Sequence, residues 1–305
     1  IYFSFGHDEE LGGLKGAKVV ADELSRRGMR AKFVIDEGNS IGDPGPVEGY
    51  DKAAYIATGE KGAVTLLLSV DQKGGHSSTP LPETAIDILA GALHAINQNP
   101  YPTRLPQSIK DYVDRRGPRM GFMNRLVGSN RWLFEPIIED LFTRNHESNA
   151  WVRSTMVPTI IRGGTSTTSI PYHAEARIHV NLLPGDTADD LEAHVREVIN
   201  DDRVKISRPD GIIMTPPISD VNGEGFKVIE RSIMEVFGDI PVTPSQLSGG
   251  TDSRYFTQLS DQVYRFVPAE LKGEAHGVNE RIPEAGFYKA IRYYIQLIRN
   301  GSQEN

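Results

Sequence analysis

The chain contains no cysteine among its 305 residues, which excludes disulfide bonds, thiolate nucleophiles and cysteine-ligated metal sites. Any bound metal ion must therefore be held by histidine, aspartate or glutamate. Positive charge is also scarce, because 33 Lys and Arg face 41 Asp and Glu and the formal net charge is −8. This balance argues against nucleic acid or an anionic membrane surface as a main partner. No run approaches about 18 apolar residues, so no membrane span is predicted.

An initiating methionine and a leader segment are missing as well. The chain opens at Ile1 inside the apolar run "IYFSF", which is typical of a strand. We therefore expect the sequence to be N-terminally incomplete. Localisation stays unassigned, because a cytoplasmic and an exported protein both fit the visible residues.

The two ends of the chain predict one discontinuous α/β domain. Strand and helix alternate at both ends, which favours a parallel sheet with helical crossovers. We expect this domain to comprise residues 1–59 and 216–305. Its predicted strands are 1–5, 31–35 and 261–268, and its predicted helices are 14–28, 226–237 and 284–300.

The middle of the chain, residues 60–215, predicts a second domain inserted into the first. Its elements follow the order β-α-β-β-α-β of a ferredoxin-like fold. An extra segment over 100–150 interrupts this order, and its aromatic residues fit either a core or an apolar pocket for a long acyl chain, with the core favoured. The predicted strands are 63–70, 151–163, 173–183 and 203–207, the predicted helices are 82–98 and 187–200, and the aromatic residues are Trp132, Phe134 and Phe142.

Acidic residues and a histidine follow several predicted strands of the first domain. The motif "GHDEELGG" supplies Glu9 and Glu10, "VIDEG" supplies Asp36, and the segment after 261–268 leads to His276. Ligands gather at strand ends in open α/β sheets, and carboxylates with imidazole suit zinc, manganese or cobalt. Adjacent glutamates point apart, so one can bind metal while the other acts as a general base.

Simpler interpretations of these residues remain open at this point. An acidic triplet in a loop is equally well a solvated surface turn, and "IDEG" by itself reads as a turn. A single histidine such as His276 is commonly structural. Only the shared placement of these residues after strands favours a metal site.

Two glycine-containing motifs carry further candidates. In "KGGHSSTP", His76 either donates to an oxyanion or stands in a strand-to-helix turn that Ser78 or Thr79 caps. In "SGGTDSRYF", Arg254 either grips a substrate carboxylate with two hydrogen bonds or opens a helix at the surface.

Taken together, these motifs resemble the M20 metallopeptidase and aminoacylase family. The segments "GEKGAVTLLLSV", "TSIPYHAEARIHVNLLPGDT" and "AHGVNERIPE" add to the likeness, in the family's order along nearly the whole chain. The carboxypeptidase S and N-acyl-amino-acid hydrolase branch is the most similar. The resemblance implies a zinc-peptidase-like α/β catalytic domain with an inserted ferredoxin-like lid, or dimerisation, domain, and a homodimer through that lid.

The resemblance also implies roles for individual residues. It implies hydrolysis of an amide bond next to a free carboxylate, in an N-acyl amino acid or at a peptide C-terminus, with two divalent ions, zinc by default and manganese or cobalt otherwise. The implied residues are Glu9 as general base, His76 polarising the carbonyl, Arg254 and Gly164 at the substrate, and Glu10, Asp36 and His276 as metal ligands.

This chain departs from the family in one important respect. The family carries a His-x-Asp motif and a bridging aspartate before the glutamate pair, and neither is present here. We therefore expect the chain as written to bind metal poorly and to be inactive. Deacetylation, dipeptide cleavage, or ligand binding without catalysis are the alternative functions. The residues do not identify the acyl group, the preferred side chain, the metal or the oligomeric state.

Overall fold

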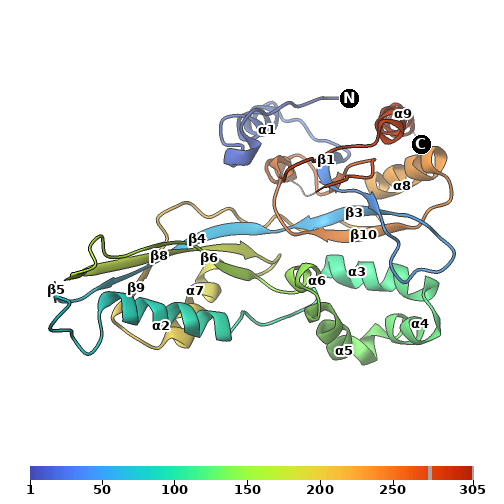
Figure 1. Cartoon of the computed structure of the whole chain (residues 1–305). Helices are drawn as coiled ribbons and strands as arrows, with labels where there is room; N and C mark the ends of the chain where they lie inside the picture. Colours follow the sequence, from blue (N-terminus) through green and yellow to red (C-terminus); the bar gives the residue numbers. More distant parts are fainter. Residues whose placement is uncertain (274–276, 304–305) are drawn as a thin grey trace. The chain divides into compact units, whose positions relative to one another are not determined.

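The computed structural model describes residues 1–273 and 277–303, which fall into two compact units (Figure 1). The first unit comprises Ile1–Glu60, Leu105–Asn145 and Pro216–Asn305, and the second comprises Lys61–Arg104 and His146–Thr215. Residues 105–145, which we expected within the inserted domain, therefore belong to the first unit. Their first helix explains why, because its Ile109 side chain is fully buried and its Ser108 hydroxyl donates to Gln246 Oε1 of that unit (2.6 Å).

The second unit contains a four-stranded antiparallel sheet, two long helices and one short helix. The spatial order of its strands is β6-β8-β4-β9, which confirms the ferredoxin-like order predicted from the sequence. The strands are β4 (Gly62–Asp71), β6 (Thr155–Arg162), β8 (His173–Leu182) and β9 (Val204–Ser207), and the helices are α2 (Ala85–Gln98), α7 (Ala188–Ile199) and the short α6 (His146–Trp151).

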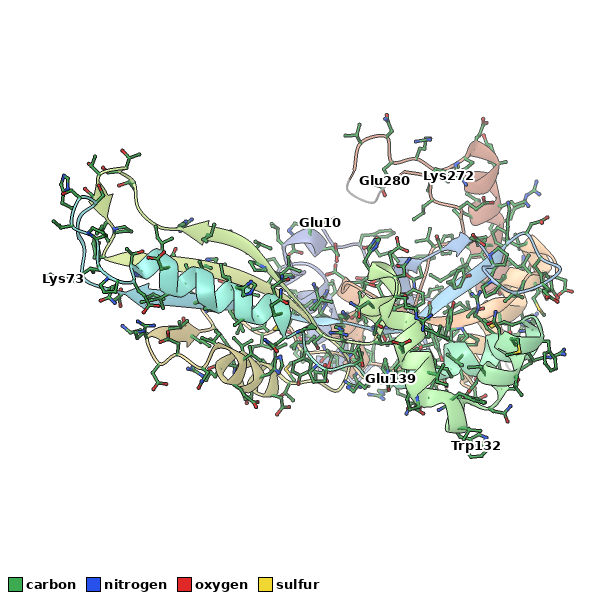
Figure 2. The ribbon with its side chains drawn as sticks, turned by 60° about the horizontal axis from the view of Figure 1, so that its bottom comes forward. Glu10, Lys73, Trp132, Glu139, Lys272 and Glu280 are labelled. Atoms are coloured by element: carbon green, nitrogen blue, oxygen red, sulfur yellow. The ribbon has the colours of Figure 1, made fainter. Side chains whose placement is uncertain are left out.

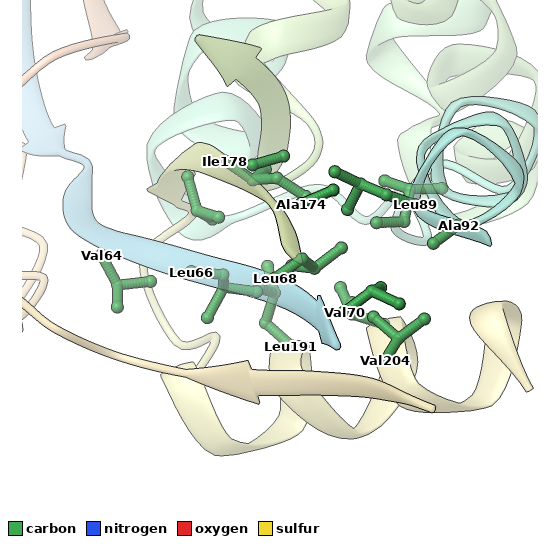
Figure 3. Packing of buried hydrophobic residues seen from close by; sticks show 14 of the residues in the cluster. Val64, Leu66, Leu68, Val70, Leu89, Ala92, Ala174, Ile178, Leu191 and Val204 are labelled. Atoms are coloured by element: carbon green, nitrogen blue, oxygen red, sulfur yellow. The ribbon is translucent and has the colours of Figure 1, made fainter. Parts of the chain in front are cut away.

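Alternating side chains build the core of this second unit. In β4 and β8 every second residue is buried, as expected for a sheet with one face covered by helices. Figure 3 shows Leu66, Leu68 and Ile178 of the sheet facing Leu89 of α2 and Leu191 of α7.

Helix starts in the second unit follow from their caps. Thr84 accepts from the backbone N–H of Asp87, and the Asp87 carboxylate accepts from the backbone N–H of Thr84, so α2 begins with a capping box. Thr187 caps α7 as the sequence predicts. Ser78 and Thr79, by contrast, follow the two-residue strand β5 (Gly75–His76) and do not cap α2, because this helix begins at Ala85 and its cap is Thr84.

The first unit contains a mixed sheet rather than the purely parallel sheet that we expected. β1 pairs with β11, and β3 with β10, in parallel, but β11 and β3 are antiparallel neighbours. The order is β1-β11-β3-β10, with β2 paired to β3. These strands are β1 (Val34–Asn39), β2 (Ile41–Gly42), β3 (Ala53–Glu60), β10 (Val242–Leu247) and β11 (Val263–Phe266).

Helices cover both faces of this sheet. Helices α8 (Glu224–Phe237) and α9 (Glu284–Gly301) pack on one face through Phe226 and Tyr293, and α3 (Gln107–Arg116) lies across β3 and β10 on the other (Figure 1). Burial on both faces explains why almost every residue of β3 is buried.

Helices α4 (Phe122–Ser129) and α5 (Arg131–Thr143) continue from α3 and the turn η2 (Gly117–Arg119). The expectation of a core position is wrong for Trp132, whose side chain is 79% exposed and projects away from these helices (Figure 2). Phe142 is half-buried, with its ring against that of Tyr112. In the described part of the chain, no helix combines the length and apolar character needed to cross a membrane.

The predicted strand over 1–5 is wrong. Residues 1–5 are exposed and pair with no strand among the described residues, and a strand without a partner leaves its backbone groups unpaired. Helix α1 (Ala17–Arg26) forms where amphipathic spacing predicts it, and Gly28 follows it with a φ of +72°.

Candidate active site

The two adjacent glutamates lie in a short turn, η1 (Glu9–Leu11), in the first unit (Figure 2). The preceding Asp8 organises this turn: its carbonyl accepts from the N–H groups of Leu11 (3.0 Å) and Gly13 (2.8 Å), and its Oδ2 accepts from Lys15 N (2.8 Å). Asp8 is therefore buried as the internal anchor of the loop, which leaves Glu9 half-buried and Glu10 exposed.

The environment of Glu9 raises the pKa of its carboxyl above the ordinary glutamate value. Partial burial is the largest cause, followed by the nearby carboxylates of Glu37, Glu10 and Asp252, while the Arg254 guanidinium opposes the rise. A carboxylate that holds protons more tightly than usual is suited to proton transfer near neutral pH.

Asp252 is a further acid that the sequence analysis did not single out. It opens the turn η3 (Asp252–Gln258), and its carboxylate lies so close to Gly13 that a Cβ there would be 1.9 Å from Oδ1. Gly13 also has a φ of +66°, so both space and backbone conformation require glycine. Burial first, and then the carboxylates of Asp36 and Asp8, raise the pKa of Asp252.

Arg254 lies on the same turn and is held against the glycine loop before it. Its Nε donates to the Thr251 carbonyl (2.5 Å), and its guanidinium covers Gly250, where a Cβ would be 2.5 Å from Nη2. The Tyr255 hydroxyl donates to the Gly12 carbonyl, which ties η3 to the loop of the two glutamates. These contacts bring Glu9, Asp252 and Arg254 into one neighbourhood.

Asp36 lies within β1, not after its end as we predicted. It is in register with Arg265 of β11, and its Oδ1 accepts from the backbone N–H of Glu37 (2.9 Å). Gly38 allows the two strands to approach, because a Cβ at this position would be 2.4 Å from Arg265 Cβ. Asp36 reaches the same neighbourhood through Asp252, whose pKa it raises.

His76 and Gly164 both belong to the second unit. His76 is exposed, is in register with Ser169 of β7 (Ser169–Ile170), and its Nδ1 lies 2.8 Å from Ser78 Oγ. Gly164 is also exposed, and a Cβ there would touch Pro171. The β5–β7 pairing thus gathers these residues at one end of that unit.

His276 lies outside the described residues. Among residues 1–273 and 277–303, no three His, Asp or Glu side chains are grouped closely enough to hold a metal ion. The donor types around Glu10 and Asp36 are nevertheless those of a hard divalent cation, and one Asp8 carboxylate oxygen is buried without a hydrogen-bond partner in the described protein.

Comparison with known proteins explains why these segments occur together. Residues 58–206 match the model of the M20 peptidase dimerisation domain. The N-fatty-acyl-amino acid synthase/hydrolase PM20D1 of Xenopus tropicalis is 36% identical over 310 residues, which cover 100% of this chain and 60% of that protein. The chain belongs to the M20 peptidase family.

Other relatives of this M20 chain agree. "Probable carboxypeptidase S-like 2" of Dictyostelium discoideum is 36% identical over 98% of this chain and 59% of its own length. The human PM20D1 protein is 33% identical over 99% of this chain and 62% of its own length. This M20 chain thus spans about 60% of the length of the curated relatives it matches.

Solved structures share the α/β fold of this chain. The M20 family metallo-carboxypeptidase Sso-CP2 from Sulfolobus solfataricus superposes with a TM-score of 0.64 at 18% identity, over 96% of this chain and 68% of that one. Human carnosine dipeptidase 1 superposes with a TM-score of 0.62 at 15% identity, over 97% of this chain and 64% of that one.

Proposed function

We propose that the protein hydrolyses the amide bond of N-acyl amino acids, next to their free carboxylate, and that the acyl group is a fatty acid. The family supports an amidohydrolase, and the name of the Xenopus relative supports fatty-acyl amino acids as the substrate class. The observation that carries the proposal is the juxtaposition of Glu9, with its raised pKa, and the Arg254 guanidinium.

In this proposal Glu9 is the general base. It takes a proton from water, whose oxygen adds to the carbonyl carbon, and it returns the proton to the departing nitrogen when the C–N bond breaks. The products are a fatty acid and an amino acid. The partial burial of Glu9 supports this role, because it raises the affinity of the carboxylate for the proton.

We assign Glu10 and Asp36 as ligands of the divalent metal ions that the metallopeptidase family implies, with His276 as a further ligand. The carboxylate donors fit such ions in kind, but the described residues do not by themselves form a complete site. A bound divalent ion lowers the pKa of water and polarises a carbonyl. Zinc is the default ion, with manganese and cobalt as alternatives.

Arg254 is proposed to bind the substrate carboxylate, and its fixed position on the glycine loop supports this role. His76 is proposed to donate to the oxygen of the scissile carbonyl, with Gly164 beside the substrate. The exposure of His76 in the second unit leaves its imidazole accessible to a ligand.

We further propose that the second unit forms a homodimer through β6. This strand is an edge of its sheet, and its apolar side chains Val157, Ile160 and Ile161 are 52%, 42% and 63% exposed. An exposed apolar edge strand pairs readily with another chain, and the family model describes this region as a dimerisation domain.

Replacement of Arg254 tests the substrate assignment. Arg254→Ala should raise KM for an N-fatty-acyl amino acid about 10- to 100-fold, because a bond between charged groups contributes about 1.5–3 kcal/mol, and should leave KM for the matching carboxamide unchanged. Steady-state kinetics on the longest form that the gene encodes provides the measurement, with N-acetyl amino acids and C-terminal peptides in the same panel. Equal effects on acid and amide would remove the assigned role, and a wild type without turnover would favour a binding protein.

A further inference from the structure

Four buried side chains next to Arg254 form a closed ring of polar contacts. The members of the ring are Glu60, Thr251, Ser253 and Arg265. Glu60 Oε2 accepts from Thr251 Oγ1 (2.9 Å), which lies 2.6 Å from Ser253 Oγ. Ser253 Oγ accepts from Arg265 Nε (2.8 Å), which also lies 3.3 Å from Glu60 Oε2. Glu60 and Arg265 are both 0% exposed, so the ring contains a fully buried ion pair.

Stability alone does not explain this ring. Removing two charges from water costs several kcal/mol per ion, and apolar side chains of similar volume are often equally stabilising. Glu60 Oε1 and Arg265 Nη2 are moreover buried without a hydrogen-bond partner in the described protein. The ion pair therefore has a cost that a positional role would explain.

The ring joins three separate segments of the first unit. Glu60 ends β3, Thr251 caps the turn η3, and Arg265 belongs to β11. Glu60 Oε2 also accepts from the backbone N–H of Thr251 (2.8 Å), so a single oxygen holds both the backbone and the side chain of the cap.

Two of these three segments, the turn η3 and the strand β11, each lie next to a candidate site residue. Arg254 follows Ser253 directly, and its Nε is held by the carbonyl of Thr251, which is itself a member of the ring. Arg265 is in register with Asp36 on the neighbouring strand. The ring therefore fixes the backbone from which the Arg254 guanidinium projects, relative to the strand pair that carries Asp36.

We propose that Glu60 and Arg265, acting through Thr251 and Ser253, are positioning residues that hold Arg254 in place for recognition of the substrate carboxylate. This inference rests on the proposed function of Arg254. It assigns no contact with substrate to the ring itself, so its loss should weaken recognition of the carboxylate and leave the chemical step unchanged.

The substitution Thr251→Val tests the proposal. Valine matches the shape of threonine but removes the hydroxyl, and it leaves Glu60 still paired with Arg265. We expect KM for an N-fatty-acyl amino acid to rise about tenfold, kcat to stay within about twofold, and KM for the carboxamide to stay constant. Thr251→Ser, which keeps the hydroxyl, should restore the wild-type preference for acid over amide.

Thr58→Val is the matched control. Thr58 is equally buried in β3 but lies outside the ring, and its hydroxyl contacts the Ser245 carbonyl (3.5 Å). Thr58→Val should lower the melting temperature of the protein without changing the preference for acid over amide. If Thr251→Val behaves in the same way, or raises both KM values equally, the ring has only a structural role and the proposal is overturned.

Two further measurements separate this inference from the proposed function. Calorimetric binding of non-hydrolysable analogues of the acid and the amide gives the preference without turnover, and Arg254→Ala is included in the same series. If Arg254→Ala abolishes the preference and Thr251→Val preserves it, the ring proposal alone fails. If the wild type binds acid and amide equally, the carboxylate role of Arg254 fails, and the positioning role fails with it.

Discussion

At the scale of single residues, the sequence predicts the polar groups that stand in recognisable motifs. The neighbouring Glu9 and Glu10 attract attention because adjacent carboxylates repel each other. Asp252 was missed because its neighbours Gly13 and Asp36 are distant in sequence. Arg265 was missed although a charged residue in the apolar run "VYRFV" was a visible signal of a buried pair. Contacts between segments that are distant in the chain, rather than local sequence, decide the positions of both side chains.

Lys61 provides a residue-scale prediction that does not depend on catalysis. Its ammonium is buried in the second unit, where Nζ donates to the Arg153 carbonyl (2.9 Å), and burial lowers its pKa to about 8 while Asp186 opposes the change. Between pH 8 and 10.5 the unfolded chain therefore binds more protons than the folded one. Stability should rise with pH across this window, by about 3 kcal/mol at most.

Urea unfolding of wild type and Lys61→Met at pH 7 and pH 10.5 measures this effect. The variant has no titrating amine, so every other pH-dependent contribution cancels in the comparison. The free energy of unfolding of the wild type, relative to Lys61→Met, should be larger at the higher pH. If the free energies of unfolding of wild type and Lys61→Met differ by the same amount at both pH values, the charge of Lys61 does not destabilise the folded state.

At the scale of elements, the sequence predicts strands whose burial alternates and misses β3 and β10, whose burial does not. β4 and β8 alternate strictly and were found. β3 and β10 have both faces covered, and β10 includes Pro244 and the buried polar Ser245 and Gln246, so neither has the period of two that marks a strand. Covering helices from distant parts of the chain make these sequences strands.

The edge strand β6 carries the element-scale prediction. Ile161→Lys places a charge on the exposed apolar edge and should raise the dissociation constant of the proposed homodimer roughly tenfold or more, because burying one isoleucine contributes about 1.5–3 kcal/mol. Analytical ultracentrifugation at several protein concentrations provides the measurement. Met214→Lys is the control, since Met214 is equally exposed in the same unit but lies outside β6. Identical dimerisation of wild type and Ile161→Lys would exclude this edge as the interface.

At the scale of the whole molecule, the order of elements was enough to predict two units and the ferredoxin-like topology of one. That residues 105–145 belong to the first unit could not be predicted from the sequence. In the chain this segment lies between elements of the second unit, and its attachment to the first depends on contacts such as that of Ser108 with Gln246. The metal site was likewise only partly predictable. Its candidate ligands come from separate segments, and His276 lies outside the described residues.

Substitution of Glu9 tests the proposed hydrolysis by a method that separates chemistry from binding. Glu9→Gln keeps the size of the side chain and a hydrogen-bonding oxygen but cannot accept the proton from water. In the longest form of the protein that the gene encodes, with divalent metal supplied, turnover of an N-fatty-acyl amino acid should fall about 10²- to 10⁴-fold. Calorimetric affinity for a non-hydrolysable analogue of the same substrate should stay within about threefold of the wild-type value, because the substitution removes a proton acceptor and not a contact that binds the ligand. Turnover by Glu9→Gln at the wild-type rate would contradict the assignment of Glu9 as the base.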